Sequence, residues 1–327
     1  MQLLPHFKGR HFIPEGTSID FMSLRQVCFW TSIAIMIGAA ALFAVNGLNY
    51  GVDFKGGTMI ELRTKAADGG TAPPADIPAL REAIGSLDLG DVQIQEFGQP
   101  SDVLIRVEQQ SGGETAQQDA LNKVLGVVGD KYVQRRVEVV GPAVSSELRT
   151  TGLIAVLASI LAIITYIWLR FEWQFAIGAV LALTHDVLIT VGVFSLFYLE
   201  FDLSTVAALL TILGYSVNDT VVVSDRIREN LRKFKKMALP DLLNRSINET
   251  LSRTLMTSGT TLIVLLSLYF LGGEVIRNFT FAMLFGVIVG TYSSIFIATP
   301  ILELLGVKRD WSGITKDQQA AASAAAS

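Results

Sequence analysis

The apolar positions of this chain fall into six long runs that are separated by polar segments of unequal length. The runs cover residues 27–45, 149–169, 173–198, 203–223, 254–271 and 278–300. An α-helix of about 20 predominantly apolar residues is long enough to cross a bilayer. The pattern therefore predicts a polytopic α-helical membrane protein with six transmembrane helices.

Residues 46–148, between the first two runs, have the mixed pattern of a domain that folds in water. Alternation with period two predicts strands, and helical spacing of apolar residues predicts helices. The expected order is strand, helix, strand, strand, helix, strand, at Thr58–Thr64, Pro78–Leu87, Val92–Phe97, Val103–Glu108, Thr115–Val128 and Arg136–Val140. Gly98–Asp102 is the predicted turn of the central hairpin. This order indicates one ferredoxin-like α+β domain.

The composition and the distribution of charge orient the chain in the membrane. Half of the residues are hydrophobic and 17% are charged, against about 25% charged in soluble domains. Residues 46–148 contain 15 acidic and 9 basic residues, whereas residues 224–253 contain eight basic and four acidic ones. Because basic connections stay on the cytoplasmic side, residues 224–253 and both termini are expected in the cytoplasm and residues 46–148 in the periplasm.

Three segments outside the apolar runs complete the expected organisation. Residues 1–26 form a cytoplasmic N-terminal segment, and the first apolar run is too long for a cleaved signal, so we expect an uncleaved anchor. Residues 224–253 are expected to form a basic loop or an amphipathic helix on the membrane surface. Residues 301–327 form a cytoplasmic tail whose alanine-rich end is of low complexity.

Two polar residues, Asn218 and Asp219, interrupt the fourth apolar run. A carboxylate inside a membrane helix costs at least about 2.5 kcal/mol and usually faces the bundle interior or a water path. The functional interpretation is a proton or ion site on this helix. The structural alternative is a polar network that only fixes how the helices pack.

His185 and Asp186 interrupt the third run, and Arg253 precedes the fifth. On straight helices the depths of Asp186 and Asp219 differ by roughly 10 Å, which favours separate steps of an ion path over one compact site. Arg253 is expected at the depth of Asp219 and would lower the cost of burying that carboxylate by pairing with it. The alternatives are a packing pair for His185 and Asp186, and an interfacial cation for Arg253.

Other chemistry has little support in the sequence. Gly56 and Gly57 let the backbone turn into the first strand, and the absence of a following Lys-Ser or Lys-Thr argues against a phosphate-binding loop. Common protease and hydrolase motifs are absent, and one cysteine and three histidines argue against a metal site. We therefore expect no enzymatic activity, no cofactor and no metal. Membrane topology accounts for the basic segment, so no nucleic-acid partner is expected.

Four sequence motifs lie in these segments: G-V-D-F-K-G-G-T at 51–58, T-H-D-V at 184–187, G-Y-S-V-N-D-T-V-V-V-S-D-R-I-R-E-N at 214–230 and S-I-N-E-T-L-S-R-T-L-M-T-S-G at 246–259. Together they resemble the SecF family of bacterial protein-export membrane subunits, which is similar in design to the resistance-nodulation-division transporters. The resemblance covers residues 20 to 305.

The resemblance implies partners and an energy source. It implies a heteromeric complex with SecD in the bacterial inner membrane, beside the Sec translocon channel, acting on a translocating preprotein. The family is driven by protons in most bacteria and by sodium ions in some. Two other functions also fit the residues: a proton-coupled exporter of small hydrophobic molecules, and a passive membrane scaffold subunit.

The resemblance also assigns roles to residues. The ion path of the family falls by motif on Asp219 and Arg253, the pair that the depth argument brings together, and less specifically on His185 and Asp186. We expect protonation of Asp219 to change this pairing and to move the bundle. The movement would reach the external domain through the linker that contains Asp53, Gly56 and Gly57.

Overall fold

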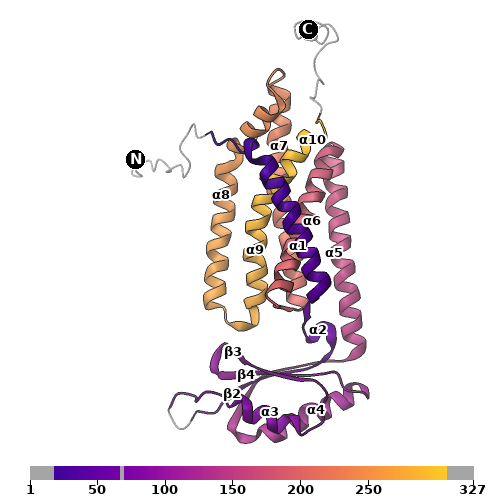
Figure 1. Ribbon diagram of the computed structural model, residues 1–327, viewed down its shortest axis with the longest axis vertical. Helices are drawn as coiled ribbons and strands as arrows, with labels where there is room; N and C mark the ends of the chain where they lie inside the picture. Colours follow the sequence, from indigo (N-terminus) through magenta and orange to yellow (C-terminus); the bar gives the residue numbers. More distant parts are fainter. Residues whose placement is uncertain (1–17, 67–69, 308–327) are drawn as a thin grey trace, which may run out of the picture.

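The computed structural model describes residues 18–66 and 70–307, which form a helix bundle with a small sheet domain at one end (Figure 1). Most of the predicted N-terminal segment and the alanine-rich tail lie outside the described residues. The described part of the chain begins (indigo) and ends (yellow) at the end of the bundle away from the sheet domain (Figure 1).

Six helical segments in this part of the chain are long and apolar enough to cross a membrane, which confirms the predicted number. The first five are α1 (Arg25–Asn46, after the 3₁₀ turn η1, Met22–Leu24), α5 (Pro142–Arg170), α6 (Trp173–Leu196), α7 (Leu203–Lys233) and α8 (Leu239–Leu271). The sixth is composed of η3 (Glu274–Ile276), α9 (Arg277–Ser293), the π-helical turn η4 (Ser294–Ala298) and α10 (Thr299–Leu304).

The helices α6, α7 and α9 form the centre of the bundle, and α1, α5 and α8 surround them. In the most apolar stretches of α6, α7 and the sixth segment, 56%, 50% and 56% of the residues are buried, against 11%, 11% and 17% in α1, α5 and α8. A helix that is apolar on all sides and buried belongs to the core of a bundle. The candidate residues of the third and fourth apolar runs therefore lie on inner helices.

The basic segment 224–253 differs from the prediction. Helix α7 continues to Lys233 and α8 begins at Leu239, so the connection is only residues 234–238 and no separate helix lies on the membrane surface. Arginine and lysine are good helix formers. The apolar residues of the segment keep the helical period and point into a buried cluster, which includes Ile227, Leu231, Leu242, Leu243 and Ile247.

The sheet domain follows α1. Its elements are β2 (Gly57–Thr64), α3 (Ile77–Gly85), β3 (Val92–Phe97), β4 (Gln99–Val107), α4 (Gly113–Val128, continued by the turn η2, Gly129–Lys131) and β5 (Tyr132–Val140). The strands pair antiparallel in the order β3-β4-β2-β5. Apolar side chains of the sheet and of α3 and α4 share one buried cluster, so the helices cover one face.

Two details of this domain differ from the prediction. The expected five-residue turn Gly98–Asp102 is much tighter, because β4 begins at Gln99 and only Gly98 lies between the strands. Gly98 has φ +78°, a conformation that favours glycine, and the strands shift register beside it. The last strand begins at Tyr132 rather than Arg136, since Tyr132 pairs with Thr64.

A second, two-stranded sheet connects the domain to the bundle. Strand β1 (Asn49–Tyr50) leaves α1 and pairs in parallel with β6 (Glu200–Phe201), which joins α6 to α7. The short helix α2 (Val52–Lys55) then leads into β2. At Gly57, φ is +117° and a Cβ would lie 2.4 Å from the carbonyl oxygen of Val107, so only glycine fits.

Candidate functional site in the helix bundle

Asp219 lies in the middle of α7 and is buried among helices, with 6% of its surface exposed. Its Oδ1 accepts a hydrogen bond of 2.6 Å from the Thr254 hydroxyl of α8. Its Oδ2 accepts a short hydrogen bond from the Ser294 hydroxyl, at the start of the π-helical turn η4. Hydroxyl groups from two neighbouring helices therefore satisfy this carboxylate.

Asp186 on α6 is also fully buried and has the same kind of environment. Its Oδ2 accepts hydrogen bonds from Ser216 (2.6 Å) on α7 and Ser293 (2.9 Å) on α9. Its Oδ1 lies 2.9 Å from Nδ1 of His185, which is buried as well. The His185 ring stacks on Tyr292 of α9, with ring centroids 5.9 Å apart. His185 and Asp186 are thus a hydrogen-bonded pair inside the bundle.

The two carboxylates belong to one polar layer. Ser216 contacts Asp186 and lies three residues before Asp219, a rise of about 5 Å rather than the expected 10 Å. Adjacent residues on a helix point about 100° apart. Ser293 therefore reaches Asp186 while Ser294 reaches Asp219. Adjacent residues of the sixth segment, Ser293 and Ser294, thus join the two carboxylates into one layer.

The expected pair between Asp219 and Arg253 is not formed in the described residues. Thr254, the next residue, faces α7 and donates to Asp219, whereas Arg253 is exposed and its charge acts on the Asp219 carboxyl only from beyond ion-pair distance. Asn218 is likewise exposed, although it adjoins Asp219. Of the five residues assigned to the ion path, the structure brings Asp219, Asp186 and His185 into one layer and leaves Asn218 and Arg253 on the outside.

The linker residues Asp53, Gly56 and Gly57 lie at the junction with the sheet domain, away from this layer. Asp53 is nevertheless connected to α7, because its Oδ2 accepts a hydrogen bond of 2.8 Å from the backbone N–H of Leu203. Leu203 is the first residue of α7, the helix that contains Asp219. The linker therefore contacts the beginning of the helix on which the polar layer is built.

Sequence reasoning missed the hydroxyl residues of the layer. A signal for some of them existed, because Thr291, Tyr292, Ser293 and Ser294 form a polar cluster inside the sixth apolar run. Thr291 adjoins the layer, because its carbonyl oxygen accepts a hydrogen bond from Ser294 and its hydroxyl lies 2.7 Å from that of Ser258. Single serine and threonine residues are common in membrane helices, so the cluster was the only distinguishing feature.

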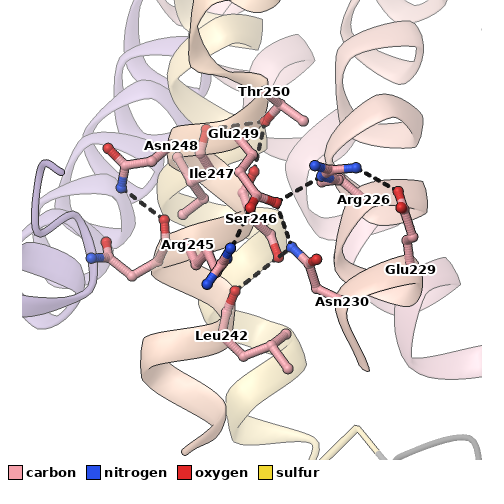
Figure 2. A network of polar contacts seen from close by, with 11 residues as sticks. Arg226, Glu229, Asn230, Leu242, Arg245, Ser246, Ile247, Asn248, Glu249 and Thr250 are labelled. Atoms are coloured by element: carbon pink, nitrogen blue, oxygen red, sulfur yellow. Dashed lines mark hydrogen bonds and ion pairs between the residues drawn. The ribbon is translucent and has the colours of Figure 1, made fainter. Parts of the chain in front are cut away.

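A second polar network lies where α7 and α8 approach their connection (Figure 2). Glu249 of α8 accepts three hydrogen bonds there, from Arg226 Nε (2.7 Å), Arg245 Nε (2.8 Å) and Asn230 Nδ2 (2.7 Å). Arg226 also pairs with Glu229 at 2.6 Å on its own helix. We call Glu249 with Arg226, Asn230 and Arg245 the Glu249 cluster. It connects the two helices through a carboxylate that both arginines face.

The chemistry available in the polar layer is the binding of a proton or of a small hard cation. Carboxylate and hydroxyl oxygens suit both. Within residues 18–66 and 70–307, no group of three or more His, Cys, Asp and Glu side chains is arranged to hold a metal ion. The oxygens of Asp219, Thr254 and Ser294 come from three helical segments, so a change in the charge of Asp219 acts on all three.

Comparison with known proteins places these features in a family context. Residues 120–308 match the family described as "Protein export membrane protein SecD/SecF, C-terminal", and residues 41–68 match the "SecD/SecF GG Motif". The second match contains Gly56 and Gly57. The two matches together include the linker, the polar layer and the Glu249 cluster.

Relatives cover nearly the whole chain. The protein named "Protein translocase subunit SecF" of Cereibacter sphaeroides is 48% identical over 94% of this chain and 95% of its own length. That of Rhodobacter capsulatus is 47% identical over 91% and 92%. "Protein translocase subunit SecDF" of Brucella abortus is 43% identical over 90% of this chain but only 38% of its own length.

A solved structure has the same arrangement of elements. The crystal structure of SecDF, a translocon-associated membrane protein from Thermus thermophilus, aligns with a TM-score of 0.78 and 36% identity. The alignment covers 89% of this chain and 39% of that one. The chain is thus similar to one part of the longer SecDF proteins of Thermus and Brucella, and to nearly the whole length of the two SecF proteins.

Proposed function

Because the chain belongs to the SecD/SecF family of protein-export membrane proteins, we propose that it is an accessory subunit of the bacterial Sec protein translocase that promotes the export of preproteins. The observation that carries the proposal is the near-complete coverage of relatives named as translocase subunits, at 48% and 47% identity. Their names describe a transport subunit and no catalytic activity.

The proposed partner is a SecD subunit, because the Brucella and Thermus relatives are named SecDF and are more than twice as long as the matched part. The surface of α7 supports this proposal. Small or polar residues of this helix recur at helical spacing on its exposed side, at Ala207, Thr211, Gly214 and Asn218. Small residues allow close helix contact, and an amide is costly against lipid. A partner helix on this face would also cover Asn218.

We further propose that the α7–α8 connection and both termini lie in the cytoplasm and that the sheet domain is periplasmic. The eight basic residues of 224–253 and the acidic excess of 46–148 support this orientation. The domain has the element order and the strand order of a ferredoxin-like sandwich. It lies at the opposite end of the bundle from the α7–α8 connection (Figure 1).

The proposed mechanism begins with a change in the charge of Asp219. Protonation, or binding of a sodium ion, changes how Asp219 accepts hydrogen bonds from Thr254 and Ser294, and so biases the packing of α7 against α8 and η4. Each charge that crosses the membrane gains roughly 2.3 kcal/mol per 100 mV. This energy biases a movement without forcing it in one event, so several cycles would act on each preprotein.

The movement would reach the sheet domain through the first turn of α7. Leu203 there donates to Asp53 of the linker, and Glu200 just before it forms an ion pair with Arg106 of β4. A shift of α7 therefore acts on the domain through two contacts besides the backbone. The mechanism needs a domain that contacts an emerging preprotein on the periplasmic side.

The test is preprotein export into membrane vesicles that contain the chain and its partner, with the gradient present or collapsed. Asp219→Asn keeps the size of the side chain and removes its titration, so the gain in export on applying the gradient should vanish. The matched control is Asp225→Asn, which neutralises an exposed carboxylate two turns further along the same helix. Repeating the assay with proton and sodium gradients separately identifies the ion.

A passive scaffold subunit is the second candidate, because hydroxyl or imidazole groups partner both Asp219 and Asp186. Such satisfied networks can serve packing alone. In that case wild type and Asp219→Asn would support equal export with the gradient present and with it collapsed. That result would overturn the ion-driven proposal and retain the family assignment.

A further inference from the structure

A row of buried hydroxyl groups on α8 extends from Asp219 toward the α7–α8 connection. Ser246, Thr250 and Thr254 follow at four-residue spacing and therefore share one face of the helix. They are 0%, 7% and 2% exposed. Thr254 donates to Asp219 at one end, and Ser246 accepts a hydrogen bond of 2.9 Å from Asn230 at the other. The row thus joins the polar layer to the Glu249 cluster.

The spacing of the row matches a chain of hydroxyls and water molecules. Successive members are about 6 Å apart along the helix axis, which is close to two hydrogen-bond lengths of about 2.8 Å. One water between two members would therefore bond to both. In this structure Ser246 and Thr250 donate instead to carbonyl oxygens of their own helix, Leu242 and Ser246 respectively.

Apolar packing closes the row in this conformation. Side chains of α7 and α8 between Asp219 and the connection are buried in one cluster, whose members here are Val223, Ile227, Ile247 and Leu251. A second apolar cluster, which includes Leu209, Ile212 and Leu265, lies on the other side of the polar layer. Along the helix axis, Asp219 is therefore enclosed from both ends by apolar side chains.

The Glu249 cluster is placed to control the opening. Glu249 adjoins Thr250 in sequence and receives donors from both helices, Arg226 and Asn230 of α7 and Arg245 of α8 (Figure 2). The side chains of Glu249 and Arg226 are 24% and 36% exposed, so the cluster lies at the boundary with water. Charge-assisted hydrogen bonds of this kind are stronger than neutral ones. They hold α7 against α8 at the end of the row nearest the α7–α8 connection.

We propose that Ser246 and Thr250 line the cytoplasmic arm of the ion path to Asp219, and that the Glu249 cluster is the gate that closes this arm. The inference rests on the proposed function, because it needs Asp219 to exchange ions with that side. When Arg226 and Asn230 release Glu249, α7 and α8 separate at this level and water enters between the hydroxyls. Glu249 acts as a latch rather than as the ion carrier, since two arginines donate to its oxygens and balance its charge, whereas only hydroxyl groups donate to Asp219.

Cysteine labelling tests the gate without an export assay. Cys28 is the only cysteine of the chain, so Cys28→Ser gives a cysteine-free background. In inside-out vesicles that contain the full chain and its partner, Thr250→Cys should react slowly with a membrane-impermeant maleimide. Adding Glu249→Gln, or in a separate variant Arg226→Gln, should speed the reaction at least about tenfold, because a charge-assisted hydrogen bond between the helices is weakened.

Two control variants distinguish an error in the proposed topology from an error in the proposed gate. Glu229→Gln makes the same change of charge at a residue whose bond to Arg226 stays within α7, so it should leave the labelling rate unchanged. Lys236→Cys, exposed in the connection, should label fast and reports that this end faces the reagent. Slow labelling of Lys236→Cys would overturn the proposed topology and with it the cytoplasmic arm. The gate would be overturned if Lys236→Cys labels fast but neither Glu249→Gln nor Arg226→Gln changes the labelling rate of Thr250→Cys. The proposed export function would be unaffected by that result, because the Asp219→Asn assay tests it separately.

Discussion

At the scale of single residues, hydroxyl groups rather than cations accompany the buried carboxylates of this bundle. Asp219 and Asp186 together accept four hydrogen bonds from serine and threonine side chains. A buried cation beside them would itself need desolvation, which can exceed the gain from pairing. Hydroxyl groups that are hydrogen-bonded cost less to bury than an ion, and they can rotate to donate or accept. The layer can therefore follow a change in the charge of Asp219 without a large rearrangement.

The stability cost of Thr254→Val should show whether Asp219 is charged when it accepts the hydrogen bond from the Thr254 hydroxyl. The substitution removes the hydroxyl with little change in shape, and a hydrogen bond to a charged group is worth about 1.5–3 kcal/mol. The free energy of unfolding should fall by that amount in the wild-type background. In Asp219→Asn the acceptor is neutral, and the cost should be about 1 kcal/mol. Thermal unfolding of the four combinations measures the coupling.

Thr257→Val is the matched control for this cycle. Its hydroxyl donates only to carbonyl oxygens of its own helix, those of Arg253 and Thr254. It should therefore show no coupling to Asp219→Asn. If Thr254→Val costs the same in both backgrounds, Asp219 is neutral in the folded protein or its bond to Thr254 does not contribute to stability.

At the scale of elements, close helix contacts determine which residues face the polar layer. Gly286 of α9 packs against Ile212 of α7, where a Cβ would lie 2.3 Å from its Cδ1. Two turns further along α9, Ser293 and Ser294 reach the two carboxylates just as the helix changes to the π-helical turn η4. Such turns are often found at functional sites. The wide turn and the close packing together set the orientation of this helix.

The contact of α1 with α6 offers a test of this packing. A Cβ at Gly192 of α6 would lie 2.3 Å from the Cβ of Ala39 on α1, so Gly192→Ala forces the two helices apart. Overpacking of this kind costs about 1–3 kcal/mol. Thermal unfolding in detergent should show the loss. Gly38→Ala on α1, where a Cβ would meet nothing within 4 Å, should be neutral or slightly stabilising. Equal melting temperatures for both variants would contradict the close contact.

At the scale of the whole molecule, the sheet domain meets the bundle at a largely buried pair of charged residues. Glu200 of β6 pairs with Arg106 of β4, and both side chains are mostly buried, at 20% and 16% exposed. Burial raises the pKa of the Glu200 carboxyl above the ordinary glutamate value of 4.5, although the charge of Arg106 acts in the opposite direction. The domain and the bundle are therefore joined by a group whose charge depends on pH.

The sign of this pH dependence follows from the raised pKa. A carboxyl whose pKa is higher when the domain is docked takes up a proton on docking, so docking is favoured as the pH falls and weakens as the pH rises through the pKa of the docked state. Hydrogen exchange at Asn49–Gly51, corrected for its intrinsic pH dependence, should be slower near pH 5 than near pH 7.5. Glu200→Gln imitates the neutral form and should exchange slowly at both pH values. Faster exchange of the wild type near pH 5 would show that the attraction of Arg106 outweighs burial.

Much of the architecture could be predicted from the sequence because it depends on local patterns. Six apolar runs of bilayer length are six helices, since a backbone in lipid must satisfy its own hydrogen bonds. The strands and helices of residues 46–148 follow in the predicted order, because period two and period 3.6 are properties of short segments. The errors lie at boundaries, such as the tight turn at Gly98 and the helical ends of the segment 224–253, where pairing and packing override local preference.

In the candidate site, too, some features follow from the sequence and others from the packing of the helices. The sequence by itself determined that Asp219, Asp186 and His185 lie inside membrane helices, because all three interrupt apolar runs that are long enough to cross a bilayer. Their burial cost marked them as candidate functional residues. Only the tertiary structure decided their partners: Thr254 rather than Arg253 faces Asp219, and Ser293 and Ser294 join two carboxylates into one layer. The physical reason is that adjacent helix residues point about 100° apart. The rotation of each helix against its neighbours, set by packing over its whole length, selects which of them enters the site.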